Sequence, residues 1–147
     1  MTPLKLALPI IVTLFSPLTA SAADPVETLE QFHAALASGN SRQALDALAE
    51  NVLIYESGHK ETSRADYAKS HLAADMAFSQ GVKRMVSSSR QILMDSHALV
   101  MQETETSGVY KGKPVHLIGL ETTLLVKRDN AWRIEHIHWS SRSRQAQ

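Results

Sequence analysis

Apolar residues recur at helical spacing from residue 26 onward. One face of the predicted helix carries Val26, Leu29, Phe32 and Leu36. Asp24 can cap this helix, because its carboxylate can accept a hydrogen bond from a free backbone N–H of the first turn, and Pro25 suits the first helical position. Gly39 and Asn40 are typical of a helix end. The pattern therefore predicts one amphipathic helix between Asp24 and Gly39.

Three further elements are predicted before residue 81. A second helix, which Ser41 can cap, has an apolar side formed by Ala44, Leu45 and Leu48. Residues 52–56 form a short strand and residues 57–62 a loop. Ser63 caps a third helix from about residue 64 to residue 78. One stripe of this helix carries Tyr67, His71, Ala74 and Phe78.

The pattern changes to strand alternation after Gly81. β-branched residues and alternating polarity predict strands near residues 82–94, 98–110, 114–127 and 131–140. Turn residues separate these strands at positions 95–96, 111–113 and 128–130. Links this short join antiparallel neighbours, and the helices must cover one face of the sheet. The predicted fold class is therefore α+β, with three N-terminal helices packed on a curved antiparallel sheet that ends in a four-strand meander.

The composition is that of one soluble globular domain. The chain has 147 residues, of which 44% are hydrophobic and 20% charged, which argues against disorder, a fibrous repeat or a coiled coil. Lys and Arg number 15, as do Asp and Glu, so no broad basic field exists to attract nucleic acid or an anionic membrane. Cysteine is absent, which excludes disulfides, thiolate metal sites and cysteine nucleophiles. Seven histidines are the main compositional indication of chemistry.

Residues 1–22 have the pattern of a secretory signal peptide. Lys5 supplies the positive charge, residues 6–18 are mostly apolar, and Ala20-Ser21-Ala22 is a small-x-small cleavage site. The alternative is a retained membrane anchor, but the apolar run is shorter than the ~20 residues that span a bilayer. We therefore expect cleavage after Ala22, a mature domain of residues 23–147, no stable membrane anchor after cleavage, and a periplasmic or secreted location.

Three segments of the chain resemble the NTF2-like superfamily. They are residues 31–40 (QFHAALASGN), 47–52 (ALAENV) and 131–136 (AWRIEH). The superfamily includes SnoaL-like, DUF4440-type and ketosteroid-isomerase-like proteins. The resemblance covers the mature chain and implies a cone, in which a curved sheet wraps around helices and a pocket opens at the wide end. It also implies a homodimer across the outer sheet face. Members include isomerases, cyclases, hydrolases, dehydratases and subunit-assembly domains, so the fold alone does not settle the function.

The ketosteroid-isomerase-like members allow a comparison at two positions. Their general base is a carboxylate near the end of the first strand, which the resemblance places at Glu56. Their oxyanion hole uses a tyrosine in the first helix, and the corresponding residue here is Phe32, which cannot donate a hydrogen bond. This departure argues against steroid isomerisation. Without a catalytic role, Glu56 would cap the following loop or pair with Lys60.

The segment Glu135-His136-Ile137-His138-Trp139 carries the sharpest chemical pattern. His136 and His138 project from one face of a regular strand, and Trp132 and Ile134 share that face. By polarity, this face is expected to point into the cone. Two histidines at i and i+2 can chelate one zinc or copper ion when further ligands complete the site. The possible further ligands are His71, His59 and a carboxylate.

The sequence thus predicts an internal pocket lined by histidines and carboxylates. The predicted lining residues are Glu56, His59, Tyr67, His71, Glu103, His136 and His138. Three functions remain open: a module that binds a small organic ligand without turnover, a lyase, isomerase or hydrolase with Glu56 or a histidine as general base, and a zinc or copper protein. No cofactor is assured. Every inward assignment depends on strand register, since a shift of one residue reverses the two faces.

His33 and Arg84 are among the residues not assigned to the predicted pocket. His33, which follows Phe32, is interpreted as structural or as lying at the helix edge. Arg84 is interpreted as one of several scattered arginines that lack the interleaved aromatic residues of a nucleic-acid surface.

Overall fold

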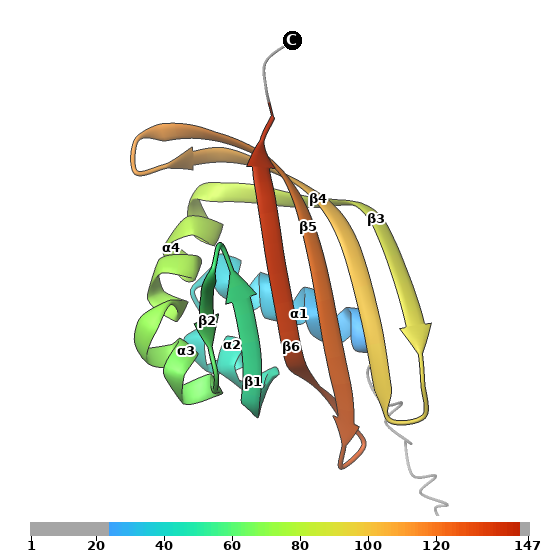
Figure 1. The fold of residues 1–147 in the computed structure, drawn as a ribbon. Coiled ribbons are helices and arrows are strands. Elements are labelled where there is room, and N and C mark those ends of the chain that lie inside the picture. The colour runs from blue at the N-terminus through green and yellow to red at the C-terminus, as the bar shows by residue number, and fades with distance from the viewer. Residues whose placement is uncertain (1–23, 145–147) are drawn as a thin grey trace, which may run out of the picture.

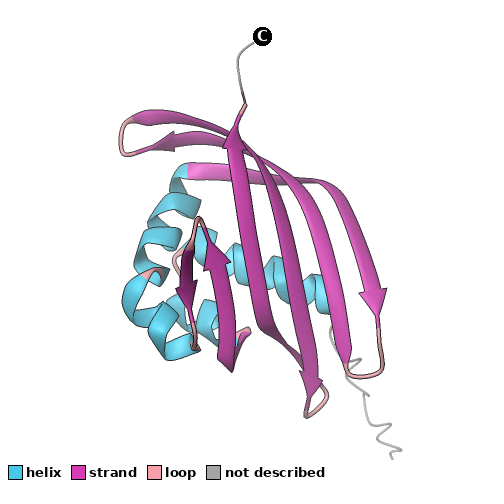
Figure 2. Cartoon of the chain, in the orientation of Figure 1, coloured by secondary structure: helices cyan, strands magenta, loops and turns pink. Residues whose placement is uncertain are grey.

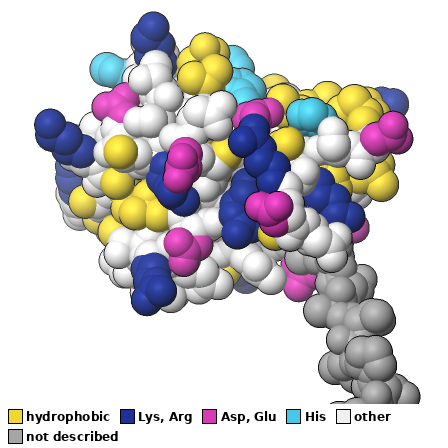
Figure 3. Space-filling model, turned by 90° about the horizontal axis from the view of Figure 1, so that it is seen from below, with side chains coloured by type: hydrophobic (Ala, Val, Ile, Leu, Met, Phe, Trp, Pro, Cys, Tyr) yellow, Lys and Arg dark blue, Asp and Glu magenta, His cyan; other side chains and the backbone are white. Residues whose placement is uncertain are grey.

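A computed structural model of the chain describes residues 24–144. The predicted signal peptide lies outside the described residues. Within residues 24–144, no helix is both long and apolar enough to cross a membrane. On the face shown in Figure 3, Lys and Arg side chains lie among Asp and Glu side chains, so the balanced charge of the sequence is intermixed on this face.

The helices begin and end near the predicted residues. They are α1 (Pro25–Ser38), α2 (Ser41–Asp46), α3 (Arg64–Ser70) and α4 (Leu72–Gly81). The Asp24 carboxylate accepts a hydrogen bond from the Val26 backbone N–H at 2.8 Å, and Gly39 ends α1 with a left-handed φ of 72°. The single helix predicted over residues 64–78 is divided in two at His71.

Six strands form one curved sheet, shown in Figures 1 and 2. They are β1 (Leu48–Glu56), β2 (His59–Glu61), β3 (Val82–Leu93), β4 (His97–Tyr110), β5 (Lys113–Arg128) and β6 (Ala131–Ser143). Their order is β2-β1-β6-β5-β4-β3. The prediction of a purely antiparallel sheet is wrong, because β1 pairs with β6 in parallel. The connection from β1 to β6 contains two helices and four strands, which is long enough for a parallel pairing, and short links alone could not reveal it.

The β1–β2 hairpin was missed by the sequence pattern. Residues 57–62, predicted as a loop, contain a two-residue turn at Ser57 and Gly58, whose φ angles are 51° and 83°. Two successive positive φ angles match the turn that suits the twist of a tight hairpin. The hairpin places β2 beside α3, which brings Glu61 next to His71.

A β-bulge in β6 reverses the expected faces of its central residues. Ile134 pairs with Leu125 of β5, whereas His136 pairs with Leu124, so Glu135 is an extra residue in β6. Ile134 and Ile137 are both fully buried as a result. The prediction that His136 and His138 point into the cone is therefore wrong, and both project from the outer face.

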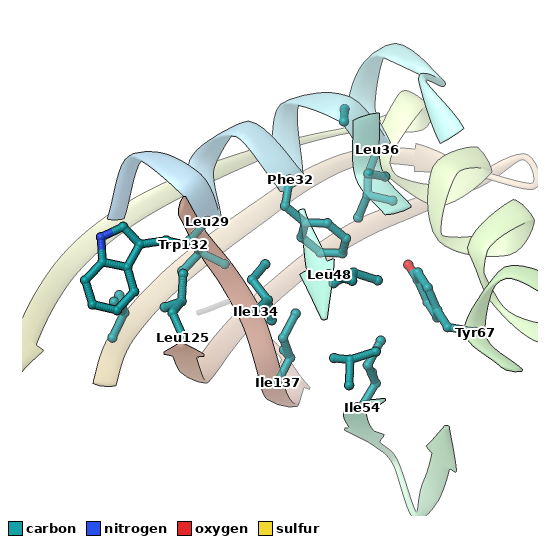
Figure 4. Close-up of a cluster of buried hydrophobic side chains, with 14 of the residues drawn as sticks. Leu29, Phe32, Leu36, Leu48, Ile54, Tyr67, Leu125, Trp132, Ile134 and Ile137 are labelled. Atoms are coloured by element: carbon teal, nitrogen blue, oxygen red, sulfur yellow. The ribbon is translucent and has the colours of Figure 1, made fainter. Parts of the chain in front are cut away.

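The core fills the space between α1 and the sheet. Figure 4 shows Leu29, Phe32 and Leu36 of α1 facing side chains from β1, β5 and β6, with Tyr67 of α3 at one side. The facing side chains are Leu48, Ile54, Leu125, Trp132, Ile134 and Ile137. Burying one large apolar side chain contributes about 1.5–3 kcal/mol, so this set of contacts fixes α1 across the sheet.

Candidate functional site

Two adjoining cavities lie between the helices and the curved sheet. The larger measures about 630 Å³ and extends between α1, α4 and strands β3–β6. A smaller recess of about 140 Å³ lies between the β1–β2 hairpin and helices α3 and α4. Glu56, Asp75 and Trp139 line both spaces. The larger volume falls in the range of small-ligand sites, which is about 300–1,000 Å³.

The recess brings together four of the seven predicted lining residues. Its walls are formed by Ile54, Glu56, Ser57, His59, Glu61, Tyr67, His71, Asp75 and Trp139. Glu56, His59, Tyr67 and His71 are therefore placed as the sequence predicted. Glu61 was missed because it lies on the unrecognised strand β2.

The break between α3 and α4 positions the polar groups of the recess. Tyr67 comes from α3, Asp75 from α4, and His71 from the junction between them. The Tyr67 hydroxyl donates to Asp75 Oδ2 at 2.8 Å. His71 Nδ1 contacts Glu61 Oε1, and the Glu61 residue is only 4% exposed. Two buried side chains, Tyr67 and Glu61, thus hold the two groups that are more accessible.

Burial and hydrogen bonding raise the pKa of the Tyr67 hydroxyl and of three further groups in the recess. Burial raises the pKa of Asp75, although the hydrogen bond from Tyr67 opposes this shift. Burial also raises the pKa of Glu56, and the negative charge of Asp75 adds to the rise. Glu56 as a whole residue is exposed at the rim, so only part of its carboxylate is desolvated. The hydrogen bond to Glu61 raises the pKa of His71.

A buried carboxylate organises the wall of the larger cavity. The Glu121 side chain is 3% exposed and receives hydrogen bonds from the Trp139 indole at 2.8 Å and the Thr123 hydroxyl at 3.1 Å. His33 Nε2 lies 2.8 Å from Glu121 Oε2, and Arg84 Nη2 lies 3.5 Å from the same oxygen. The His33 contact is close but is not an aligned hydrogen bond, since Nε2 has no partner in hydrogen-bond geometry among residues 24–144.

These partners keep Glu121 ionised. Burial alone raises the pKa of its carboxyl, but the charge and proximity of His33, the Arg84 guanidinium and the Trp139 indole outweigh burial and lower the pKa to about 2. Sequence reasoning treated His33 as structural and Arg84 as scattered. One usable signal was Glu121 itself, a lone carboxylate within the largely apolar run of residues 115–126.

Glu103 is not part of either cavity, contrary to the prediction. Its neighbours Gln102 and Thr104 are buried and occupy the inner face of β4. Alternation then places Glu103, together with Glu105, on the outer face.

The four histidines considered as metal ligands form two separate pairs. His59 and His71 lie at the recess, with ring centroids 5.9 Å apart. His136 and His138 lie on the outer face, where Tyr55 packs against both rings and His136 Nδ1 lies 2.9 Å from the Leu53 carbonyl oxygen. The bulge in β6 separates the pairs, so the predicted combined ligand set is wrong. Among residues 24–144, no three His, Asp or Glu side chains are grouped to hold a metal ion.

Tyr67→Phe is expected to destabilise the protein by about 1–2 kcal/mol, because Asp75 would lose its buried donor. The same change should raise the pKa of Asp75 further, since the Tyr67 hydrogen bond lowers it. Urea unfolding and an NMR titration of Asp75 measure the two effects. Tyr55→Phe on the outer face is the matched control, with an expected change below about 0.5 kcal/mol. Equal losses in both variants would contradict the role given to the Tyr67–Asp75 bond.

The fold and its internal cavity define the class of protein. An α+β cone with helices packed inside a curved sheet of six strands is the NTF2-like architecture. More specifically, the SnoaL-like domain family matches residues 26–143, and the chain belongs to this family. The match does not distinguish the DUF4440-type members.

Solved structures support this assignment. A protein from Shewanella frigidimarina NCIMB 400, described as a candidate ketosteroid isomerase, is 35% identical, with 84% of this chain and 98% of that chain covered and a TM-score of 0.76. A candidate scytalone dehydratase from Novosphingobium aromaticivorans DSM 12444 is 16% identical over 82% and 85% of the two chains, with a TM-score of 0.66. The CaMKII hub of S. rosetta is 21% identical over 85% and 100%, with a TM-score of 0.67. The last two show the fold alone. A search of curated proteins found no match.

Proposed function

We propose that the protein binds a small organic molecule in the joined cavities and transfers a proton on it, with Glu56 as the general base. The supporting observation is the state of Glu56: it lines both cavities, its pKa is raised, and no hydrogen-bond partner holds its carboxylate within residues 24–144. A carboxylate with a raised pKa and no hydrogen-bond partner is suited to accept a proton near neutral pH. The 35% identical relative, described as a candidate isomerase, supports the same reaction class.

His71 supplies a matching acid in the same recess. Its Nδ1 is engaged by the buried Glu61, which raises the pKa of the imidazole and favours the protonated ring. Nε2 is then the ring atom left to donate a proton to a bound molecule. The pKa of Glu56 is thus raised toward neutral pH, and the pKa of His71 is raised above its ordinary value. A base and an acid tuned by their surroundings in one recess form the pattern of an acid–base pair.

The reaction is not assigned to steroids. Phe32 is fully buried, with its ring stacked on Trp139 at a centroid distance of 6.4 Å and an interplanar angle of 10°. A phenylalanine there offers no hydroxyl to stabilise negative charge on a substrate oxygen. The proposal therefore covers an isomerase or lyase step that starts with removal of a proton.

The base can be tested with 5-nitrobenzisoxazole, a small aromatic molecule whose ring opens when a base removes its C3 proton. The rate constant of the purified protein is expected to fall roughly a hundredfold in Glu56→Gln, the size of a general-base contribution. The pH profile of the wild-type rate should rise through a midpoint above 4.5, since the pKa of Glu56 is raised from that value.

Glu103→Gln is the matched control, because Glu103 is a carboxylate on the outer face of the same sheet. Its rate should equal that of the wild type. A Glu56→Gln variant that keeps the full rate, or a wild-type midpoint at the ordinary carboxyl value, would contradict Glu56 as the base.

Binding without turnover is the second candidate function. The Tyr67 hydroxyl is bound to Asp75 and the Trp139 indole to Glu121, so neither is free to stabilise charge on a reacting molecule. Saturable binding of 5-nitrobenzisoxazole without ring opening would favour this function over catalysis.

The location and the oligomeric state expected from the sequence stay predictions. A periplasmic or secreted location rests on the pattern of residues 1–22. A homodimer across the outer sheet face is compatible with exposed apolar side chains there, such as Leu53 and Tyr55. Structural neighbours that are hub and association domains of a kinase show the same fold in assembly domains.

A further inference from the structure

The wall of the larger cavity carries a guanidinium group whose charge is already balanced. Arg84 Nη1 lies 3.4 Å from Glu30 Oε2, and Nη2 lies 3.5 Å from Glu121 Oε2. Nη2 also donates to the side-chain oxygen of Gln102, which is buried. The Arg84 side chain is 21% exposed and lines the cavity, so one positive charge here faces two carboxylates.

Arg84 nevertheless keeps hydrogen-bond donors for a ligand. A guanidinium has five N–H groups, and the contacts to Glu30, Glu121 and Gln102 involve only its two terminal nitrogens. Both carboxylate contacts are long and neither is a two-point contact. At least the Nε–H and one terminal N–H therefore have no partner among residues 24–144, although the group borders the cavity.

The surrounding charges determine which ligand can use these donors. Glu121 is buried and ionised, with a pKa lowered to about 2, and Glu30 adds a second negative charge at the rim. An anionic ligand at Arg84 would lie beside both carboxylates, between which the guanidinium is already shared, and Lys83, which also lines the cavity, is exposed to solvent. A cationic ligand would lie against the guanidinium. Such repulsion is stronger in a partly desolvated cavity than in water.

We infer that Arg84 anchors the ligand through a neutral oxygen acceptor, and that the ligand is an uncharged carbonyl or hydroxyl compound with an apolar body. This inference rests on the ligand cavity of the proposed function and names its substrate class. The apolar wall beside Arg84 is formed by Ala34, Ala37, Phe78, Val82 and Leu117. Glu30 is the specificity determinant, because its charge keeps Arg84 from attracting anions.

Three compounds that share a naphthalene ring and differ in the substituent at position 2 test this inference. They are 2-acetylnaphthalene, 2-naphthoate and 2-naphthylmethylamine, and their affinities are measured by equilibrium dialysis at pH 7. The ketone is expected to bind at least tenfold more tightly than the carboxylate and the amine. In Arg84→Met, the ketone should bind about tenfold more weakly, at the level of 2-ethylnaphthalene.

Glu30→Gln provides a gain-of-binding test in which the Arg84 side chain stays in the cavity wall. Glu30 is half-exposed, and glutamine keeps an oxygen that can accept the hydrogen bond from Gln102 Nε2, which is 2.8 Å in length. The affinity for 2-naphthoate should rise about tenfold, while the affinity for the ketone stays within twofold. Arg90→Met is the control for a lost guanidinium, since Arg90 is exposed on the same strand and lines neither cavity, and the ketone affinity should not change.

The outcomes separate this inference from the function on which it rests. The substrate class would be overturned if the wild type bound the carboxylate or the amine most tightly, or if Glu30→Gln left the carboxylate affinity unchanged. Neither result would contradict ligand binding in the cavity or Glu56 as the base. Failure of all three naphthalenes and 2-ethylnaphthalene to bind would contradict the ligand cavity and the inference together.

Discussion

Gly108→Ala is expected to lower the free energy of unfolding by about 3 kcal/mol or more, because the added Cβ has no room. Built on the Gly108 backbone, it would lie 2.4 Å from the Gly81 carbonyl oxygen and 2.7 Å from Val82 Cα. These are backbone atoms at the junction of α4 and β3, where Val82 pairs with Gly108 itself. Relief of the clash would therefore separate β3 from β4. The φ of Gly108, 157°, adds strain for any other residue.

Urea unfolding followed by far-UV circular dichroism measures this loss, and Gly112→Ala is the matched control. Gly112 also has a positive φ, 75°, but nothing lies within 4 Å of the position that an added methyl group would occupy. Backbone strain alone should cost about 1 kcal/mol there. If the two variants lost the same stability, the close approach of β3 and β4 would not be the cause. A Gly108 variant that folds should also bind 2-acetylnaphthalene more weakly, since Arg84 lies two residues beyond Val82.

The long strands were predictable because their signals are local. The predicted range of residues 82–94 is observed as Val82–Leu93, and residues 131–140 as Ala131–Ser143. Alternation and turn residues act over neighbouring positions and are visible in the sequence. Strand β2 has three residues, His-Lys-Glu, with no apolar alternation, and it forms only because the tight turn at Ser57 and Gly58 brings it against β1.

In the candidate site too, positions set by local spacing were predictable and positions set by strand pairing were not. Tyr67 and His71 could be placed on one stripe of a helix from their spacing, and the structure brings both to the recess, together with Asp75 of α4. The inward assignment of His136 and His138 failed because a single bulge, set by pairing with β5, reverses alternation after Ile134.

The wall of the larger cavity was beyond sequence reasoning for a different reason. Glu30, Arg84 and Glu121 come from α1, β3 and β5, and no spacing relates them. Their contact depends on the complete fold, so only the structure shows that the scattered arginine and the lone strand carboxylate are partners.

Glu121→Gln is expected to cost about 3 kcal/mol at pH 7 and to flatten the acid branch of the stability curve. The pKa of Glu121 is about 2 in the folded protein against an ordinary value of 4.5. A depressed folded-state pKa contributes stability that is present above the unfolded value and is lost as pH falls through the folded value. Each pKa unit corresponds to about 1.4 kcal/mol, which gives the size of the expected loss. The wild type should therefore weaken between about pH 4.5 and pH 2.

Urea midpoints measured from pH 3 to pH 8 test this dependence. Glutamine keeps the size of the side chain and one oxygen for the Trp139 indole, but it removes the negative charge that His33 and Arg84 contact. The difference between wild type and Glu121→Gln should shrink as pH falls below 4.5. Asp75→Asn should behave in the opposite way, since a raised folded-state pKa contributes stability at low pH that is lost as pH rises through the folded value. Parallel curves of urea midpoint against pH for the wild type and Glu121→Gln would contradict a stabilising role for the ionised Glu121 carboxylate.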